Sequence, residues 1–297
     1  MTIVIAGGSG FLGRKLAKRF ESEGHQVITL TRRPAGDGSQ VSWQPDGGPG
    51  TLPRHLDGVD AVVNLAGEGI ADKRWSAARK ERIRSSRILS TRTLVRAVTL
   101  CAHPPRVFVS GSAIGYYGHR DHTPVSETTE PGSDFLARLC VEWEHEARMV
   151  ASSSTRLAIV RTGLPLDKDG GALAKMLWPF KLGLGATLAS GDQCMSWIHI
   201  DDWTAMVSWL IRDNRAVGAF NATAPAPVSN RTFTRTLGRV LHRPAVLHAP
   251  AFALRAALGE LSSVLVEGQS VLPAYAERLG FRFSHRALEP ALKSLNL

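Results

Sequence analysis

Short apolar runs alternate with amphipathic stretches through the first two-thirds of the chain. Strand-length, mostly apolar runs occupy five segments: residues 2–6, 26–30, 60–66, 106–110 and 157–161. Apolar positions recur at helical spacing in three longer segments: residues 12–22, 76–100 and 133–144. Apolar strands that alternate with helices are typical of a parallel sheet covered on both faces. The pattern therefore predicts an α/β fold, a Rossmann-type doubly wound parallel sheet.

The last third of the chain is less regular. Residues 196–200 predict a further strand and residues 201–211 a helix, with Asp201 or Asp202 as its N-cap. From about residue 230 the pattern is mainly helical, with breaks at four prolines: Pro244, Pro250, Pro273 and Pro290. We expect a dinucleotide-binding domain over residues 1–225, with substrate-lobe segments interleaved around 165–200. A small, mainly helical C-terminal domain would cover 226–297.

A glycine motif follows the first predicted strand directly. Gly7, Gly10 and Gly13 are spaced three apart, with Phe11 and Leu12 between the last two, where a helix begins. The first glycine permits a sharp turn, the second lets the backbone approach a pyrophosphate, and the third lets helix and strand pack closely. Because the motif lies between a strand and an amphipathic helix, it predicts a dinucleotide site.

The end of the second strand indicates which dinucleotide binds. An NAD site usually has a carboxylate there for the ribose hydroxyls, whereas this chain has Thr31, Arg32 and Arg33. A guanidinium can hold a 2′-phosphate through two hydrogen bonds. Either arginine can also simply point into solvent, but the missing carboxylate still favours NADP(H) over NAD.

The next two strands also end in candidate site residues. "NLAG" places Leu65, Ala66 and Gly67 at the expected cofactor-facing edge. "VSGSAIGYYG" offers Ser112, with Tyr116 and Tyr117 close behind. With the glycine motif, this combination resembles the extended short-chain dehydrogenases/reductases, which include nucleotide-sugar epimerases and dehydratases. In that group a serine after the fourth strand, a tyrosine and a lysine transfer the proton, and Ser112 matches the serine.

The tyrosine and lysine of that group stand four residues apart, where the lysine lowers the pKa of the tyrosine. This chain has three tyrosines, and none is followed four residues later by lysine. Phe135 and Leu139, or one register later Leu136 and Cys140, take the place of the pair. The usual proton transfer of the group is therefore excluded.

A narrower resemblance covers essentially the whole chain. The segments "NLAGEGIADKRWSAARKERIRSSRILST", "SGSAIGYYG", "DFLARLCVEWE" and "MSWIHIDD" are similar to an atypical epimerase-family subgroup that itself lacks the pair. The tail "PAFALRAALGELSSVLVEGQSVLPAYAERLGFRF" resembles the small C-terminal domain of that subgroup. The resemblance implies NADP binding, a cofactor-facing Arg87 and a backbone contact from Leu164 beneath the nicotinamide. Plant relatives are associated with chloroplast division, so a non-catalytic role stays open.

A replacement acid or base would come from the remaining polar side chains. Ser112 and Tyr117 are the catalytic candidates, and Glu68, Tyr116 and His199 are weaker ones. A catalytic tyrosine needs a pKa lowered from about 10. Three residues are candidates for the substrate pocket: Tyr116, Lys181 and Trp197. The alternative interpretation places Trp197 in the core, together with Trp178 and Phe180.

The amino-acid composition narrows the kinds of partner and site that the protein can have. The chain has 297 residues, 43% of them hydrophobic, and three cysteines without metal or redox spacing. The net charge of +10 is spread along the chain, so we expect no nucleic-acid or membrane partner and no metal. The basic stretch 74–87 predicts a solvated helix face with one or two ligand contacts, and it disfavours a symmetric dimer. We expect a cytoplasmic monomer or weak homodimer.

Two functions therefore stay open. One is an NADP(H)-dependent oxidoreductase or epimerase that moves hydride at a carbonyl or hydroxyl carbon of an unidentified small molecule. The other is an NADPH-responsive regulator or scaffold.

Overall fold

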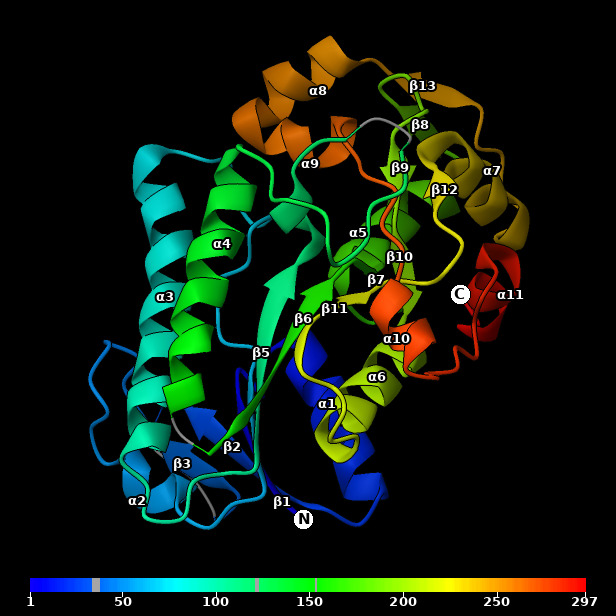
Figure 1. Ribbon diagram of the computed structural model, residues 1–297. Helices are drawn as coiled ribbons and strands as arrows, with labels where there is room; N and C mark the ends of the chain where they lie inside the picture. Colours follow the sequence, from blue (N-terminus) through cyan, green and yellow to red (C-terminus); the bar gives the residue numbers. More distant parts are fainter. Residues whose placement is uncertain (34–37, 121–122, 153) are drawn as a thin grey trace.

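A seven-stranded parallel sheet forms the centre of the computed structural model, which describes residues 1–33, 38–120, 123–152 and 154–297 (Figure 1). Its strand order is β11-β6-β5-β4-β1-β2-β3, with every neighbouring pair parallel. The strands are β1 (Thr2–Ala6), β2 (Gln26–Thr31), β3 (Gln40–Ser42), β4 (Ala61–Asn64), β5 (Val107–Ala113), β6 (Arg156–Thr162) and β11 (Gly218–Ala222). The predicted fold class is confirmed.

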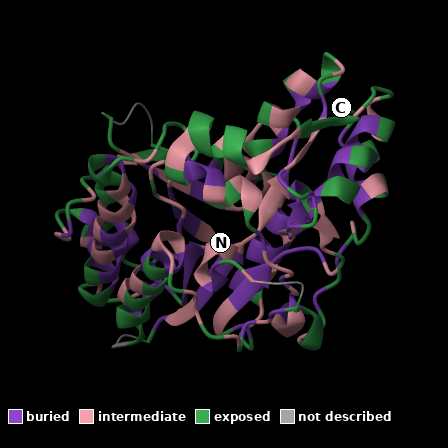
Figure 2. Ribbon diagram, turned by 90° about the horizontal axis from the view of Figure 1, so that it is seen from above, coloured by how far each residue is buried: buried purple, intermediate pink, exposed green. Residues whose placement is uncertain are grey.

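Helices cover both faces of this sheet. On one side lie α1 (Phe11–Ser22) and α6 (Ile200–Arg212); on the other lie α3 (Ala77–Thr99) and α4 (Phe135–Arg148), with the short α2 (Leu52–Leu56) (Figure 1). Successive residues of β1 alternate between the two faces. Ile3 and Ile5 pack with α1 and α6, whereas Val4 and Ala6 pack with α3. Buried side chains accordingly follow the strands and the inner sides of the helices (Figure 2).

The C-terminal half adds small strand pairs and further helices above the sheet (Figure 1). The pairs are β7 (Leu164–Leu166) with β10 (Trp197–His199), β8 (Ala186–Leu188) with β13 (Leu247–Ala249), and β9 (Cys194–Met195) with β12 (Val228–Ser229). The helices are α5 (Gly171–Lys181), α7 (Asn230–Val240), α8 (Ala251–Leu258), α9 (Ser263–Val266), α10 (Ala274–Arg278) and α11 (Leu288–Ser294). Phe281, Phe283 and Leu292 share one apolar cluster with β1 and β6. The last segment therefore packs directly on the nucleotide-binding half.

Two sequence-based expectations need correction. β11 was not anticipated, because its sequence GAFNA is poor in β-branched residues. It is an edge strand of the sheet and is buried because distant segments, including α10, Glu127 and Leu272, pack on it. The N-cap of α6 is His199, whose ring nitrogen accepts the amide of Asp201, and neither aspartate fills that role. Asp202 is buried and instead accepts the amides of Ser284 and His285.

No helix among the described residues is both long enough and apolar enough to cross a membrane.

Candidate cofactor and substrate site

The glycine motif forms a tight turn between β1 and α1. Gly7 has φ +82°, and a Cβ there would lie 2.6 Å from the carbonyl oxygen of Leu65. A Cβ on Gly13 would lie 2.3 Å from the carbonyl oxygen of Gly7, which is the close helix–strand packing that the motif predicts. Gly8, which the motif analysis passed over, is equally confined, since a Cβ there would meet the Thr29 side chain at 2.5 Å.

The N-terminus of α1 is left open for an anion. Its N-cap is Gly10, which brings no side-chain cap, and no acidic residue stands in the first turn. The first amides of a helix lack intrahelical partners, so those of Phe11, Leu12 and Gly13 are available donors. Gly10 is exposed, and its Cβ would meet only the Gly7 carbonyl at 3.1 Å. This arrangement fits a pyrophosphate.

Arg32 and Arg33 stand exposed at the end of β2. The backbone amide of Arg33 donates to Thr31 Oγ1, and neither guanidinium has a hydrogen-bond or ion-pair partner among the described residues. Both side chains are therefore free to meet a phosphate on the adenosine ribose.

Arg87 is a half-buried cation without a carboxylate partner among the described residues. Its Nη1 donates to the carbonyls of Glu68 and Ile83, and its guanidinium lies 5.3 Å from the ring of Trp143. Burial and the nearby Arg79 lower its pKa. A Cβ on Gly67 would lie 3.1 Å from this side chain. The uncompensated charge beside the "NLAG" segment suits an anionic ligand.

The remaining predicted cofactor residues lie at or near the carboxyl edge of the sheet. Leu65 and Ala66 are half-buried after β4, and the Ala66 amide donates to Asn64 Oδ1. Phe11 packs over Gly170, whose Cβ would meet its ring at 2.2 Å. Leu164 begins β7, and its amide donates to the carbonyl of Ser196.

Ser112 opens a buried polar network. Its hydroxyl donates to Glu144 Oε1 at 2.8 Å, and both oxygens of this wholly buried carboxylate accept from Arg161. Arg161 also donates to the Tyr117 hydroxyl, which in turn donates to Asn221 Oδ1 at 2.7 Å. The Ser112 proton is therefore committed to a structural ion pair.

Neither Tyr117 nor Cys140 fits the expected acid–base role. Tyr117 is fully buried, and burial raises its pKa to about 12 instead of lowering it. Burial beside Glu144 likewise raises the pKa of the Cys140 thiol to about 12. Phe135 and Leu139 occupy the helix face as predicted, and Phe135 packs edge-on against Trp75 at 5.3 Å. The structure therefore offers no titratable replacement for the missing pair at these positions.

The three predicted substrate-pocket residues do not converge. Trp197 is fully buried, and its indole donates to the carbonyl of Ala226, so it belongs to the core. Lys181 is exposed at the end of α5. Tyr116 is half-buried, with the Arg161 guanidinium stacked 3.5 Å from its ring centroid. Of the two other core candidates, Phe180 is buried and Trp178 is 71% exposed.

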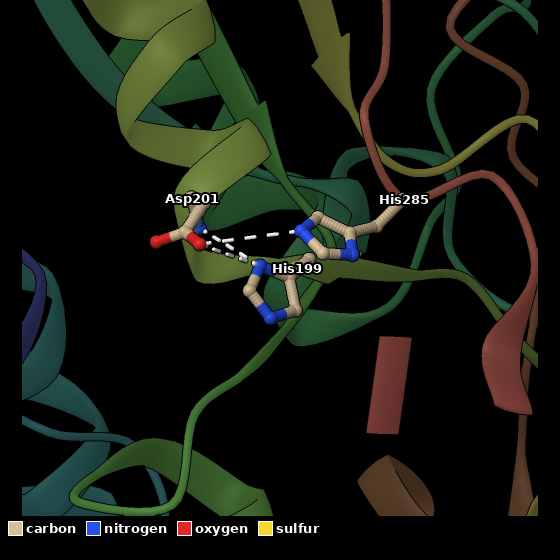
Figure 3. A group of neighbouring side chains, drawn as sticks. All are labelled: His199, Asp201 and His285. Carbon is tan, nitrogen blue, oxygen red and sulfur yellow. Dashed lines mark hydrogen bonds and ion pairs between the residues drawn. The ribbon is translucent and has the colours of Figure 1, made fainter. Parts of the chain in front are cut away.

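His199, Asp201 and His285 each bring a potential metal-ligand atom within 4.8 Å of the others (Figure 3). The rings of His199 and His285 stack at 3.7 Å, and His199 Nδ1 already accepts the Asp201 amide. His199 Nδ1 and His285 Nε2 both face Asp201 Oδ2, at 3.6 and 4.0 Å. Because the lone pair of His199 Nδ1 is taken up by the Asp201 amide, this ring serves as the N-cap of α6.

The basic stretch on α3 is not the solvated face that was expected. Within this stretch, Arg84 Nε donates to Glu142 of α4 at 2.7 Å; beyond it on α3, Arg92 Nε donates to Glu146 of α4 at 3.1 Å. Arg79 is buried against Glu68 and the carbonyl of Gly69. Most of these charges therefore join α3 to its neighbours, which leaves Arg87 for a ligand.

Comparison with known proteins identifies related chains. A model of the NAD dependent epimerase/dehydratase family matches residues 3–222, and a model described as a domain of unknown function (DUF1731) matches residues 249–295. Epimerase family protein Mb2239 of Mycobacterium bovis is 40% identical over 291 residues, covering 98% of this chain and 96% of that protein. These matches confirm the resemblance drawn from the motifs.

Solved structures agree with this assignment. The crystal structure of human epimerase family protein SDR39U1 (isoform2) with NADPH is similar with a TM-score of 0.93 and 33% identity, covering 99% of both chains. The nucleoside-diphosphate sugar epimerase from Corynebacterium glutamicum is similar with a TM-score of 0.81 and 32% identity, covering 99% of this chain and 58% of that one.

Proposed function

The chain belongs to the NAD dependent epimerase/dehydratase family, and we propose that it binds NADP(H) and moves hydride between the nicotinamide and a carbonyl or hydroxyl carbon of a small molecule. The observation that carries the proposal is the open glycine turn at α1, together with two arginines at the end of β2 whose guanidinium groups have no partner among the described residues. The human relative crystallised with NADPH supports the choice of cofactor.

The residues at the carboxyl edge of the sheet have different roles in binding the cofactor. The amides at the start of α1 hold the pyrophosphate, and the glycines keep side chains out of its way. Arg32 and Arg33 bind the 2′-phosphate, and Arg87 supplies a further positive charge toward the diphosphate or ribose. When bound, the nicotinamide supplies or accepts the hydride.

The side chains of this site position the cofactor, and the catalytic candidates are not suited to transfer a proton. Ser112 is committed to Glu144, and Tyr117 and Cys140 keep their protons at neutral pH. We therefore expect the proton to come from water or from the substrate, with the Ser112–Glu144–Arg161 network holding the end of β5 in place.

The lack of a proton-transferring side chain among the catalytic candidates also favours a second function. A protein that binds NADPH but lacks a proton-transferring side chain suits a regulator or scaffold whose conformation reports the cofactor. Turnover distinguishes the two functions: NADPH that is bound tightly but never oxidised across a broad panel of carbonyl compounds favours the regulator.

The first experiment is a fluorescence titration of NADPH and NADH into the wild type and Arg32→Ala. Loss of a charged hydrogen-bonded contact weakens NADPH binding by about 1–3 kcal/mol, or roughly 5- to 150-fold, and leaves NADH binding unchanged. Arg54→Ala, an exposed arginine on α2, is the matched control. Equal binding of both cofactors to the wild type would contradict the assignment of Arg32 to the 2′-phosphate.

A further inference from the structure

A concavity of about 460 Å³ lies between α7 and the segment that leads into β13, on the C-terminal part of the molecule. Four arginines line it: Arg231, Arg235, Arg239 and Arg243. The first three are spaced four residues apart on α7, so they share one helix face. We call this concavity the arginine groove.

The positive charge of the arginine groove is only partly compensated. Arg231 lies 3.3 Å from Asp192, and Arg239 lies 2.6 Å from Glu289. Arg243 donates its Nε to the carbonyl of Lys181 and meets no carboxylate among the described residues. Arg235 is exposed and has neither a hydrogen bond nor an ion pair among them. Like charges four apart destabilise an isolated helix, so the face favours an added anion.

Helix packing does not account for this cluster. On α3, the arginines at 84 and 92 each reach a glutamate of α4. On α7 the apolar face, with Phe233 and Leu237, packs inward, and the arginines point away from it into the groove. Arg239 reaches Glu289 of α11, whereas Arg235 lines the groove without a carboxylate partner among the described residues.

The backbone fixes the shape of the groove. A Cβ on Gly238 would lie 2.7 Å from Cβ of Ala245, so this glycine lets the segment before β13 approach α7 closely. The amide of Arg243 donates to the carbonyl of Gly238 at 2.9 Å, which holds this arginine beside the end of α7, where it also lines the groove. Val246 and Leu247, 83% and 45% exposed, add an apolar rim.

We propose that the arginine groove binds a small molecule that carries two or more linked phosphate groups, at a site separate from the glycine motif. Guanidinium groups form paired hydrogen bonds with phosphate oxygens, and several of them around one concavity suit adjacent phosphates. The volume lies within the range of small-molecule sites. This open concavity has no phenylalanine, tryptophan or tyrosine in its lining. It therefore fits a compact ligand better than a nucleic-acid strand, which follows an extended basic path with stacking aromatics.

The test is calorimetric titration of inorganic tripolyphosphate into the full-length protein at about 150 mM salt. Saturating NADPH occupies the glycine site; if NADPH does not bind, the titration is run without it, so the two proposals fail independently. We expect saturable binding that weakens about tenfold in Arg235→Gln and further in the double variant with Arg243→Gln. Arg282→Gln, an exposed arginine outside the groove, should bind as the wild type does.

Thermal unfolding of each variant checks that the fold is kept, since both glutamines replace side chains outside the apolar core. Equal affinity in the wild type and the double variant would overturn the proposal, as would the absence of saturable binding. A single-stranded RNA could also bind more tightly than tripolyphosphate and lose this binding in the same variants. That result would assign the groove to a nucleic acid and would also overturn the proposal.

Discussion

Arg161 and Glu144 form an ion pair from which solvent is almost completely excluded, with Nε 2.8 Å and Nη2 2.9 Å from the two carboxylate oxygens. The pair joins β6 to α4 behind β5, which carries Ser112 near its end. Because Ser112 and Tyr117 both bond to it, the pair occupies the hydroxyl groups of the two side chains that were the catalytic candidates. The polar groups remain, but their role is structural.

Glu144→Gln should destabilise the protein by about 3–5 kcal/mol, because it leaves the buried Arg161 without a counter-charge. Urea unfolding measures the change. Arg148→Gln is the matched control, since Arg148 contacts the same carboxylate but is half-exposed, and it should cost less than about 1 kcal/mol. Equal losses of unfolding free energy in the two variants would show that burial of the Arg161–Glu144 pair does not determine the cost of removing it.

Tyr117→Phe should lower the free energy of unfolding by about 1–2 kcal/mol, since Arg161 and Asn221 each lose a buried partner. NADPH affinity should not change, because the Tyr117 side chain has no exposed surface. If the protein reduces a carbonyl substrate, its pH–rate profile should also be unchanged. A profile that loses one limb in the variant would restore Tyr117 as an acid or base.

The sequence was sufficient for five of the seven strands of the sheet and for the glycine turn, because these depend on local patterns. β1, β2 and the helix between them are encoded by contiguous apolar periodicity and by glycine spacing. The role of Arg161 was not predictable in the same way. Its partner Glu144 lies 17 residues earlier and its neighbour Tyr117 lies 44 earlier, so only the tertiary fold brings them together.

The same limit explains why Trp197 was assigned to the substrate pocket and why His199 was not recognised as the N-cap of α6. Both lie in β10, whose alternation gives no sign that the segment packs on β7 inside the core. Asp201 and Asp202 have the residue type preferred for an N-cap, but His199 holds the extended backbone position that accepts the Asp201 amide. Residue preference alone placed the cap two residues too late.

The two glycines at the start of α1 should respond differently to alanine. Gly13→Ala places a Cβ 2.3 Å from the Gly7 carbonyl, so the turn must shift and stability should fall along with NADPH binding. In Gly10→Ala the added Cβ lies farther from that carbonyl oxygen, at 3.1 Å, so the free energy of unfolding should change little. NADPH binding should nevertheless weaken by about tenfold or more, because the methyl group lies where the backbone approaches the pyrophosphate. Thermal unfolding and fluorescence titration separate the two effects. Unchanged NADPH affinity in Gly10→Ala would place the phosphates elsewhere.

Stability should fall on acidification through His199. Its Nδ1 accepts the Asp201 amide, so the neutral ring carries its proton on Nε2, 3.3 Å from the Ser294 hydroxyl. Burial and the adjacent His285 lower the pKa of His199 in the folded protein, against about 6.5 in the unfolded chain. The unfolded chain therefore takes up the proton first. This stability is complete above about pH 7 and is lost as the pH falls through 6.5 toward the lowered value.

His199→Asn keeps a side-chain acceptor at the N-cap of α6 but removes the titrating group. The variant should therefore lose less stability than the wild type between about pH 7.5 and 5.5, whatever its stability at the upper end. His55→Asn, at an exposed position on α2, is the matched control and should keep the wild-type dependence. Urea unfolding at a series of pH values provides the comparison. If the free energy of unfolding depends on pH in the same way in the wild type and in His199→Asn, protonation of His199 does not contribute to the acid sensitivity, and other groups are responsible.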